Sequence, residues 1–571
     1  MSSAGGRADP RGMEIRRSLD RVEPPAGRLR PVLGPEPAPG PAEGEAIPFT
    51  GWLGLLRALS EVVGPAVLIM GFMRFVPAVP AHRPGRRPPA LRWLTRPRTG
   101  SGWGSSAASA TASLASPTGS CPSSAGSGAG LVRVYLYWSQ VEPEPDRWTF
   151  DTVDAFLDQL DGSEEVWVTV CSSSRWATRQ ATDFLPPSPA KDLEAYRRFV
   201  DRLVRHCAGR IRYWQCDNEP SNVGLLWAGT AAEYVTQLKV MYRAVKDADP
   251  DALVVLGGAP FGLPESPPDS PDRQFFDVLL ADGRDAFDLF DLHLYGEASR
   301  IRADIETARG LMRALGYEKP LVAGEYNAPW PNLSPEAVAA MQAAMAAAFA
   351  ADPDVSGGQG PDGAAQRTPE QAAMASLYER MPSLPPQLQM FMRGCPPELE
   401  ARRHRINCRE IVMRTLLALA SGVRRTICWN LAPEIPGYEN HLSVMDLLFG
   451  KLALLDYEGT GLSRRHPAAD TFALVAGRLT DVDSVVRIEA PGRPSLYLFE
   501  VRRRGRGPLL VVWDQRDSFS GEDDPPVAFD WPWPEARAAA VDAFGQPQPA
   551  EVRDGRVHLE ASITPLLVTA G

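Results

Sequence analysis

Apolar runs alternate with amphipathic stretches from residue 131 to about residue 431. Between the runs, apolar residues recur at helical spacing, as in 231–248, where Tyr234, Leu238, Met241 and Val245 fall on one helix face. Strands that alternate with helices of this length predict βαβ units and a parallel sheet. The strand-like runs lie at 131–138, 165–171, 211–217, 252–258, 287–294, 320–325 and 425–431.

These seven runs are one short of the eight strands in a closed (β/α)8 TIM barrel. We therefore expect a barrel over 128–470 whose first strand precedes residue 131. The apolar run at 66–73 is one candidate for that strand, but nothing in its pattern favours it strongly.

The region that precedes the barrel has an unusual composition. Residues 1–46 are polar and rich in proline and arginine, and between 100 and 130 only Trp103, Leu114 and Cys121 are not Gly, Ala, Ser, Thr or Pro. Such composition predicts that 1–127 is a largely disordered N-terminal region in which the first barrel strand is missing or unrecognisable. Two origins stay open: GC-rich DNA read in a shifted frame, or a natural flexible linker.

Two further segments differ from the barrel pattern. The insertion 329–408 contains an Ala/Met-rich helical stretch at 337–351 and a Gly/Pro-rich loop, and it would lie over the top face of the barrel as a substrate-shaping lid or as a structural flap. After residue 470, short alternating runs separated by turn residues predict an all-β sandwich over 471–571.

Charge and cysteine content exclude several classes of function. The chain has 60 basic and 70 acidic residues, a net charge of −10, which gives no general attraction to nucleic acid. Its 7 cysteines show no zinc-type spacing, so we expect neither metal nor organic cofactor. The first 46 residues lack an apolar signal-peptide core and the run at 62–73 is too short to span a bilayer, so we expect no membrane partner and a cytoplasmic location.

Two glutamates end strand-like runs. Glu219 lies in the Asn218-Glu219-Pro220 motif that closes IRYWQCDNEP, and Glu325 closes KPLVAGE. Catalytic groups of a barrel gather at the carboxyl ends of its strands. Two carboxylates that face one sugar there, one protonated and one ionised, are the minimal equipment for glycoside hydrolysis, although a strand-end glutamate is also common in a salt bridge.

Other residues of the same strand ends are candidates for substrate contacts. Tyr295 can hydrogen-bond a nucleophilic carboxylate, and Arg133 can hold that carboxylate ionised. His293 can line a sugar site or be structural, and Trp429 can stack on a sugar ring or be a core residue. Asn218 can hydrogen-bond a sugar hydroxyl, and the weaker candidates are Trp138, Trp176 and Asn327.

Several segments together resemble the clan A glycoside hydrolases, most closely family 39, which includes β-xylosidases and α-L-iduronidases. They are RVYLYWSQVEPEPDRWTFD, the NEP run, LWAGTAAEYVTQLKVMYRAVKDADPDALVVLGG, DLHLYG and GEYN. The resemblance implies a retaining hydrolase acting on a carbohydrate, with Glu219 as the acid/base and Glu325 as the nucleophile. Asp217 replaces the tryptophan that family 39 usually has before the asparagine.

Two other functions stay open from the sequence. One is a catalytically silent carbohydrate-binding protein on the same scaffold. The other is a barrel enzyme of different chemistry, because a fold alone does not determine function.

Overall fold

The computed structural model describes residues 26–29, 47–50, 108–113, 130–160, 162–330, 369–432, 444–458 and 461–571. The expected helix at 337–351, the apolar run at 66–73 and most of the expected disordered region 1–127 lie outside these ranges. Within them, none of the helices is long and apolar enough to cross a membrane.

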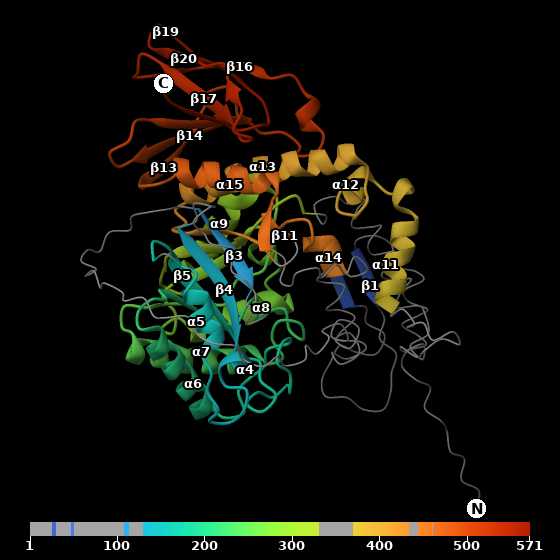
Figure 1. Cartoon of the computed structure of the whole chain (residues 1–571), viewed down its shortest axis with the longest axis vertical. Helices are drawn as coiled ribbons and strands as arrows, with labels where there is room; N and C mark the ends of the chain where they lie inside the picture. The colour runs from blue at the N-terminus through green and yellow to red at the C-terminus, as the bar shows by residue number, and fades with distance from the viewer. Residues whose placement is uncertain are drawn as a thin grey trace, which may run out of the picture.

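One parallel sheet of eight strands forms the centre of the described chain (Figure 1). All seven strands predicted from the apolar runs are confirmed, and the sheet order is β7-β6-β5-β4-β3-β10-β9-β8. The seven are β4 (Leu131–Tyr137), β5 (Glu165–Cys171), β6 (Tyr213–Cys216), β7 (Leu253–Val255), β8 (Phe290–His293), β9 (Leu321–Tyr326) and β10 (Thr426–Cys428).

The eighth strand is β3 (Ala108–Ser113), in the Gly/Ala/Ser-rich region before residue 131. It pairs in parallel with β4 on one side and with β10 on the other. The prediction that the missing strand precedes residue 131 is confirmed, but the expectation that this composition leaves no recognisable strand is not. An alternation of alanine, serine and threonine carries no apolar signal, and only the backbone pairing with both neighbours identifies the strand.

The two edge strands of the sheet approach each other. Isolated parallel bridges join Val255 to Leu289 and Ala259 to Leu292. The Leu256 amide donates to the Leu289 carbonyl at 3.0 Å, and the His293 amide donates to the Ala259 carbonyl at 3.0 Å. Backbone hydrogen bonds therefore continue across the gap between β7 and β8.

Helices follow most of the strands, and some of them begin at a side-chain cap. In α7 (Ala231–Ala248) the Thr230 side chain accepts from the Glu233 amide and the Glu233 carboxylate accepts from the Thr230 amide, a reciprocal capping box. The other helices are α4 (Trp138–Val141), α5 (Asp151–Leu157), α6 (Leu193–Cys207), α8 (Pro271–Asp282), α9 (Ile301–Ala314), α11 (Pro369–Glu379), α12 (Pro386–Gln389), α13 (Pro397–Ala420), α14 (Val444–Phe449) and α15 (Pro467–Arg478), with short 3-10 turns at Leu263–Glu265, Ala298–Arg300, Met381–Ser383 and Gly521–Asp523.

One face of the sheet carries a layer of apolar side chains. One buried residue on or next to each strand of the parallel sheet except β3 contributes to this cluster: Leu131, Trp167, Tyr213, Val255, Leu289, Val322 and Ile427. Because side chains alternate along a strand, the residues two positions later form a second inward layer. That second layer includes Arg133, Thr169, Gln215 and Asp291, all buried and polar.

The C-terminal residues form two antiparallel sheets with their own core, and α13 and α15 lie between them and the parallel sheet (Figure 1). The first sheet holds β13 (Val482–Glu489), β14 (Leu496–Arg503), β15 (Leu509–Asp514), β21 (Leu566–Ala570), β17 (Ala538–Asp542) and β18 (Pro547–Gln548), and the second holds β16 (Val527–Pro532), β20 (Arg556–Ala561) and β19 (Glu551–Arg553). Two antiparallel strand pairs complete the described strands: β1 (Ala26–Leu29) with β2 (Ile47–Thr50), and β11 (Leu455–Glu458) with β12 (Gly461–Arg465). The predicted boundary at 470 falls inside α15.

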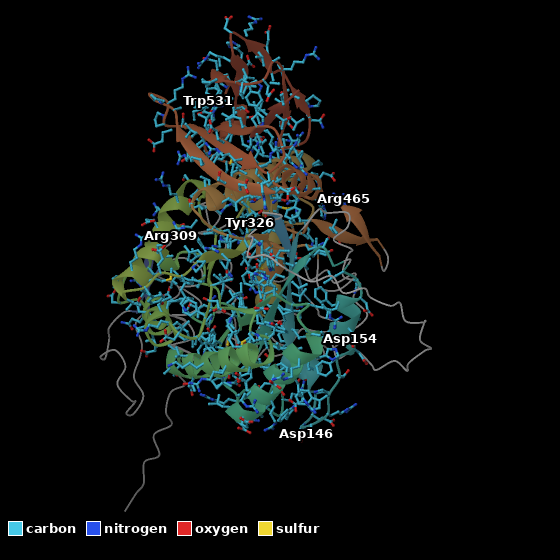
Figure 2. All side chains as sticks on the ribbon, turned by 90° about the vertical axis from the view of Figure 1, so that its left-hand side faces the viewer. Asp146, Asp154, Arg309, Tyr326, Arg465 and Trp531 are labelled. Atoms are coloured by element: carbon cyan, nitrogen blue, oxygen red, sulfur yellow. The ribbon has the colours of Figure 1, made fainter. Side chains whose placement is uncertain are left out.

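Both faces of the first C-terminal sheet are buried. In β14, Leu496 and Leu498 face the second sheet, while Phe499 belongs to the cluster shared with the helices. The Glu522 carboxylate accepts from Arg405 and Arg409 of α13, each at 2.7 Å, and so ties the C-terminal sheets to that helix. Trp531 marks these sheets in Figure 2, and Asp146, beyond α4, marks the opposite end of the molecule.

Candidate active site

Glu219 leaves the end of β6 through an unusual backbone turn. Both Asp217 and Glu219 have positive φ, 50° and 40°, a region that L-residues other than glycine rarely adopt. The buried Asp217 carboxylate accepts from the amide and hydroxyl of Ser172, and its burial raises its pKa to about 7 despite these bonds. Left-handed residues of this kind cost of order 1–3 kcal/mol each and occur where the fold needs a side chain in one particular direction.

The side chain of Glu325 points to the same face of the sheet as that of Val322, because β9 has one residue more than β8 between their paired positions. Asp291 of β8 pairs with Val322 and His293 pairs with Glu325, so two residues of β8 face three of β9. The same shift occurs on the other side, where Thr426 pairs with Ala323 and Cys428 with Tyr326. Strict alternation after the inward Val322 would turn Glu325 outward, so this bulge re-aims its side chain.

Three donors hold the Glu325 carboxylate. Its Oε1 accepts from Arg133 Nη1 at 3.0 Å and from the Tyr135 hydroxyl at 2.6 Å, and its Oε2 accepts from the Tyr295 hydroxyl at 2.9 Å. Burial opposes ionisation, but the charges of His293 and Arg133 and the two tyrosine hydrogen bonds outweigh it and lower the pKa of Glu325. This carboxylate is therefore kept ionised.

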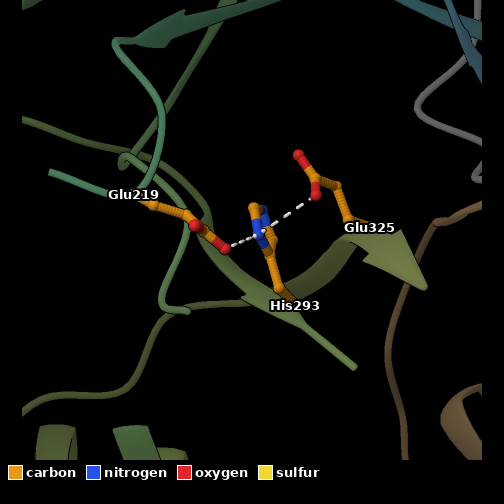
Figure 3. Close-up of side chains that lie close together, drawn as sticks. All are labelled: Glu219, His293 and Glu325. Carbon is orange, nitrogen blue, oxygen red and sulfur yellow. Dashed lines mark hydrogen bonds and ion pairs between the residues drawn. The ribbon is translucent and has the colours of Figure 1, made fainter. Parts of the chain in front are cut away.

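His293 lies between the two glutamates (Figure 3). Its Nδ1 is 2.5 Å from Glu219 Oε1 and 3.5 Å from Glu325 Oε2, and its Nε2 is 3.3 Å from Asp291 Oδ2. Burial alone would lower the pKa of His293, but the carboxylates of Glu325, Asp291 and Glu219 outweigh it and raise that pKa to about 10. At neutral pH the ring is an imidazolium that donates to carboxylates on both sides.

The two glutamates come close to each other. One ligand atom each of Glu219, His293 and Glu325 lie within 4.8 Å of one another, a spacing at which these residues could also face a cation. No other grouping of this kind occurs in the part of the chain that the structure describes. The guanidinium of Arg133 and the ring of His293, whose pKa is raised, place positive charge beside these carboxylates.

Most of the residues expected at the site come together. Arg133 links Glu325 to Asn218, whose Oδ1 accepts from Arg133 Nη2 at 2.7 Å. The Tyr295 hydroxyl donates to Glu325, and the Trp330 ring stacks on the Tyr295 ring at a centroid distance of 5.0 Å. The proposed nucleophile, its arginine and the asparagine of the NEP motif therefore belong to one hydrogen-bonded network.

Three expected residues, Asn327, Trp176 and Trp138, occupy other places, whereas Trp429 adjoins the site through Phe449, whose ring also packs against Tyr295. Asn327 is buried and fully engaged by protein groups: its Nδ2 donates to the carbonyls of Trp429 and Leu452, and its Oδ1 accepts from Asn407. Trp429 is half-buried and packs edge-on against Phe449. Trp176 lies further out.

The Trp176 indole donates to the Glu142 carbonyl at 2.9 Å, and its ring packs edge-on against Trp138. Neither partner contacts Glu219 or Glu325. Trp138 is itself fully buried, with its indole nitrogen donating to the Glu142 carboxylate. This pair therefore belongs to the core beside α4.

Sequence reasoning missed several residues of the site. Tyr135 follows Arg133 by two positions, and Asp291 precedes His293 by two, so strict strand alternation places each beside a residue that was recognised. Gln215 precedes Asp217 by two positions, and its side-chain Oε1 accepts from Arg133 Nη2 at 2.6 Å. The aromatic side chains of Trp330 and Phe449, whose ring centroids are 4.8 Å apart, had no such signal because neither lies on a strand: Trp330 follows β9, and Phe449 ends α14.

Solved structures similar to this chain include glycoside hydrolases of families 39 and 51. A family 39 glycoside hydrolase from the gut symbiont Bacteroides cellulosilyticus WH2 aligns with a TM-score of 0.49 and 14% identity over 78% of this chain and 76% of that one. A family 39 β-xylosidase from Caulobacter crescentus aligns with a TM-score of 0.48 and 12% identity over 81% of this chain and 96% of that one. AbfB, a family 51 α-L-arabinofuranosidase from Bifidobacterium longum, aligns with a TM-score of 0.49 and 12% identity over 81% of this chain and 94% of that one.

No protein-family model and no curated protein sequence matches this chain. The structural neighbours include the family that the sequence motifs resemble.

Proposed function

We propose that this protein is a retaining glycoside hydrolase that cleaves O-glycosidic bonds by double displacement, with Glu325 as nucleophile and Glu219 as acid/base. In this proposal the parallel sheet closes through the β7–β8 bridges into a (β/α)8 barrel, and the C-terminal sheets form an accessory β-sandwich. The substrate is a carbohydrate bound at the carboxyl ends of the strands, where both glutamates lie.

The observation that carries the proposal is the spacing of the two glutamates. Retaining enzymes hold their carboxyl groups about 5–5.5 Å apart, whereas inverting enzymes leave about 6.5–9.5 Å for a water molecule. An oxygen of Glu219 and an oxygen of Glu325 within 4.8 Å of each other fit the shorter range. A direct attack by Glu325 on the sugar needs no water between them.

The two carboxylates have different surroundings, which suits their different tasks. Glu325, with its lowered pKa and its arginine and tyrosine donors, is ionised and aligned to attack the anomeric carbon. In Glu219, Oε1 contacts His293 instead, and Oε2 accepts from the side-chain Nδ2 of Asn222 at 2.7 Å. It carries none of the three donors that fix Glu325.

His293 gives Glu219 a source for the proton that a leaving group needs. The imidazolium–carboxylate pair and the imidazole–carboxylic acid pair hold the same number of protons. A shift of one proton along the 2.5 Å contact from Nδ1 to Glu219 Oε1 therefore makes Glu219 an acid. After the leaving group departs with that proton, the Glu219 carboxylate takes a proton from water, and the hydroxide formed releases the sugar from Glu325.

A panel of aryl glycosides tests this function, with wild type beside Glu325→Gln. We expect wild type to release the phenol from at least one member and Glu325→Gln to lose at least roughly 10⁴-fold in kcat, as is usual when a nucleophile is removed. Glu318→Gln, which changes an exposed glutamate of a surface ion pair, is the matched control and should keep the wild-type rate. An equal rate in Glu325→Gln would refute the assignment, and sugar binding without turnover by wild type would indicate a silent binding protein.

A further inference from the structure

Beneath the two glutamates lies a third carboxylate, Asp291, to which the proposed mechanism gives no task. It is fully buried, two residues before His293 on β8. A buried carboxylate is costly unless donors surround it, so its partners indicate what the fold uses it for.

Asp291 contacts two other strands and one residue of its own strand. Its Oδ1 accepts from the Gly324 amide at 2.5 Å, and its Oδ2 accepts from Gln215 Nε2 at 2.8 Å. The same Oδ2 faces His293 Nε2 at 3.3 Å. One side chain of β8 thereby joins β6, β9 and the ring that contacts Glu219.

The contact with Gly324 lies at the bulge of β9. A bulge leaves a backbone donor outside the regular ladder, and a buried donor of this kind needs a partner. Asp291 supplies it at the residue immediately before Glu325. The bulge is what turns Glu325 inward, so the Asp291 carboxylate supports the orientation of the nucleophile.

Two glycines leave room for this arrangement. A Cβ on Gly324 would lie 2.3 Å from Asp291 Oδ2, and a Cβ on Gly258 would lie 2.2 Å from His293 Nε2. Neither glycine is required for a left-handed backbone, because neither has a positive φ. Their absent side chains make space for the carboxylate and the ring, an observation independent of the hydrogen bonds.

We propose that Asp291 is a positioning residue that sets the spacing of the two glutamates, holding the β9 bulge before Glu325 with one oxygen and His293 against Glu219 with the other. This inference rests on the proposed function and deepens it. Asp291 touches no substrate and acts through the Gly324 peptide and the His293 ring. The groups that face His293 are Glu219 after β6, Glu325 of β9 and Asp291 itself, and Arg133 of β4 lies behind Glu325.

The test compares Asp291→Asn with Asp288→Asn. An asparagine has one oxygen for three donors, so its NH2 group must face the Gly324 amide, Gln215 or His293. Asp288 is the matched control: it lies three residues earlier, accepts from the Val254 amide at 2.8 Å and pairs with Lys246, away from both glutamates.

Crystal structures and kinetics of the two variants give separate readouts. We expect Asp291→Asn to move the nearest Glu219 and Glu325 oxygens beyond 4.8 Å and to lower kcat about 100-fold at a nearly unchanged KM, the usual scale for a small misplacement of catalytic groups. Asp288→Asn should keep both the spacing and the rate. An Asp291→Asn structure with an unchanged bulge and spacing would overturn the proposal, whatever its rate.

If Asp291→Asn does not fold, a measurement on the wild-type protein still tests the proposal. Nitrogen-15 NMR of the histidine rings, with His293 assigned by its absence in His293→Asn, reports whether Nε2 carries a proton donated to Asp291. The proposal requires that proton, and a bare Nε2 would overturn it. If wild type hydrolyses no glycoside, the proposed function fails, while the spacing in the variant structures and the His293 spectrum still decide the role of Asp291.

Discussion

Two layers of side chains inside the parallel sheet differ in composition although they lie only two residues apart on each strand. The lower layer is apolar, from Leu131 of β4 round to Ile427 of β10. The upper layer is polar, with Arg133, Gln215 and Asp291 fully buried and connected by hydrogen bonds. The same strands thus provide a packed core at one level and a charged network at the next.

Successive layers along the strands therefore differ in what they contribute: one contributes to stability and the next to the chemistry of the proposed site. The apolar layer excludes water and packs without directional requirements, so its residues contribute mainly hydrophobic stabilisation. The polar layer is costly to bury, and every member needs partners from other strands. Its arrangement is therefore the part of the interior that serves the two glutamates above it, and changes in the two layers should have different consequences.

After the loss already expected for Glu325→Gln, the largest effect is expected above the polar layer, at Glu219. In Glu219→Gln we expect kcat to fall by roughly 10³-fold for a glycoside whose leaving group needs a proton, since general acid catalysis supplies a factor of this size. A dinitrophenyl glycoside, whose leaving group departs without a proton, should lose much less in the first step. Stopped-flow release of both phenols measures the difference. Equal losses for the two substrates would argue against Glu219 as the acid.

A change in the apolar layer should affect folding instead. Ile427→Ala removes buried methyl groups beneath the site and should lower the free energy of unfolding by about 2–5 kcal/mol, as for other truncations in a packed core. Urea unfolding measures this loss. The kcat of the folded fraction should stay within a few-fold of wild type, and a loss of activity as large as that of Glu219→Gln would contradict the separation of the two layers.

The charge of His293 should make stability depend on pH. Its folded pKa, about 10, lies above its ordinary value of 6.5, so its contribution is fully present below pH 6.5 and is lost as the pH rises through 10. Wild type should therefore lose more unfolding free energy between these limits than His293→Asn does. His558→Asn, which removes an exposed histidine of β20, is the control and should follow wild type. Parallel curves for wild type and His293→Asn would show that the ring is neutral.

The smallest effect is expected from a single donor to Glu325, the proposed nucleophile. Tyr295→Phe removes the hydroxyl that donates to Glu325 Oε2 and leaves Arg133 and Tyr135 in place. One hydrogen bond to a charged group is worth about 1.5–3 kcal/mol, so kcat should fall by at least roughly 10-fold. Steady-state kinetics beside Tyr497→Phe, in the C-terminal sheets, would show whether the loss is specific. A wild-type rate in Tyr295→Phe would mean that the remaining donors suffice.

The sequence determined the strands that carry an apolar signal and the residues that end them. Seven of the eight parallel strands followed from apolar runs, and Glu219, Glu325, His293, Tyr295 and Arg133 were chosen as candidates from their places on or after those runs; their roles stay predictions. This worked because burial on both faces requires a continuous apolar run, and a charged residue that interrupts such a run is conspicuous. The run at 108–113 has no such signal and was placed only by its pairing with β4 and β10.

The direction of Glu325 was decided by the tertiary structure alone. From the alternation of β9 its side chain would point outward, and the bulge that turns it inward is defined by pairing with strands β8 and β10, distant in sequence. Asp291 is another case, because a carboxylate in an apolar run shows neither its donors nor its purpose until Gly324 and Gln215 are brought to it. Local pattern fixes which face of a strand is buried, whereas register and long-range hydrogen bonds decide which buried groups meet.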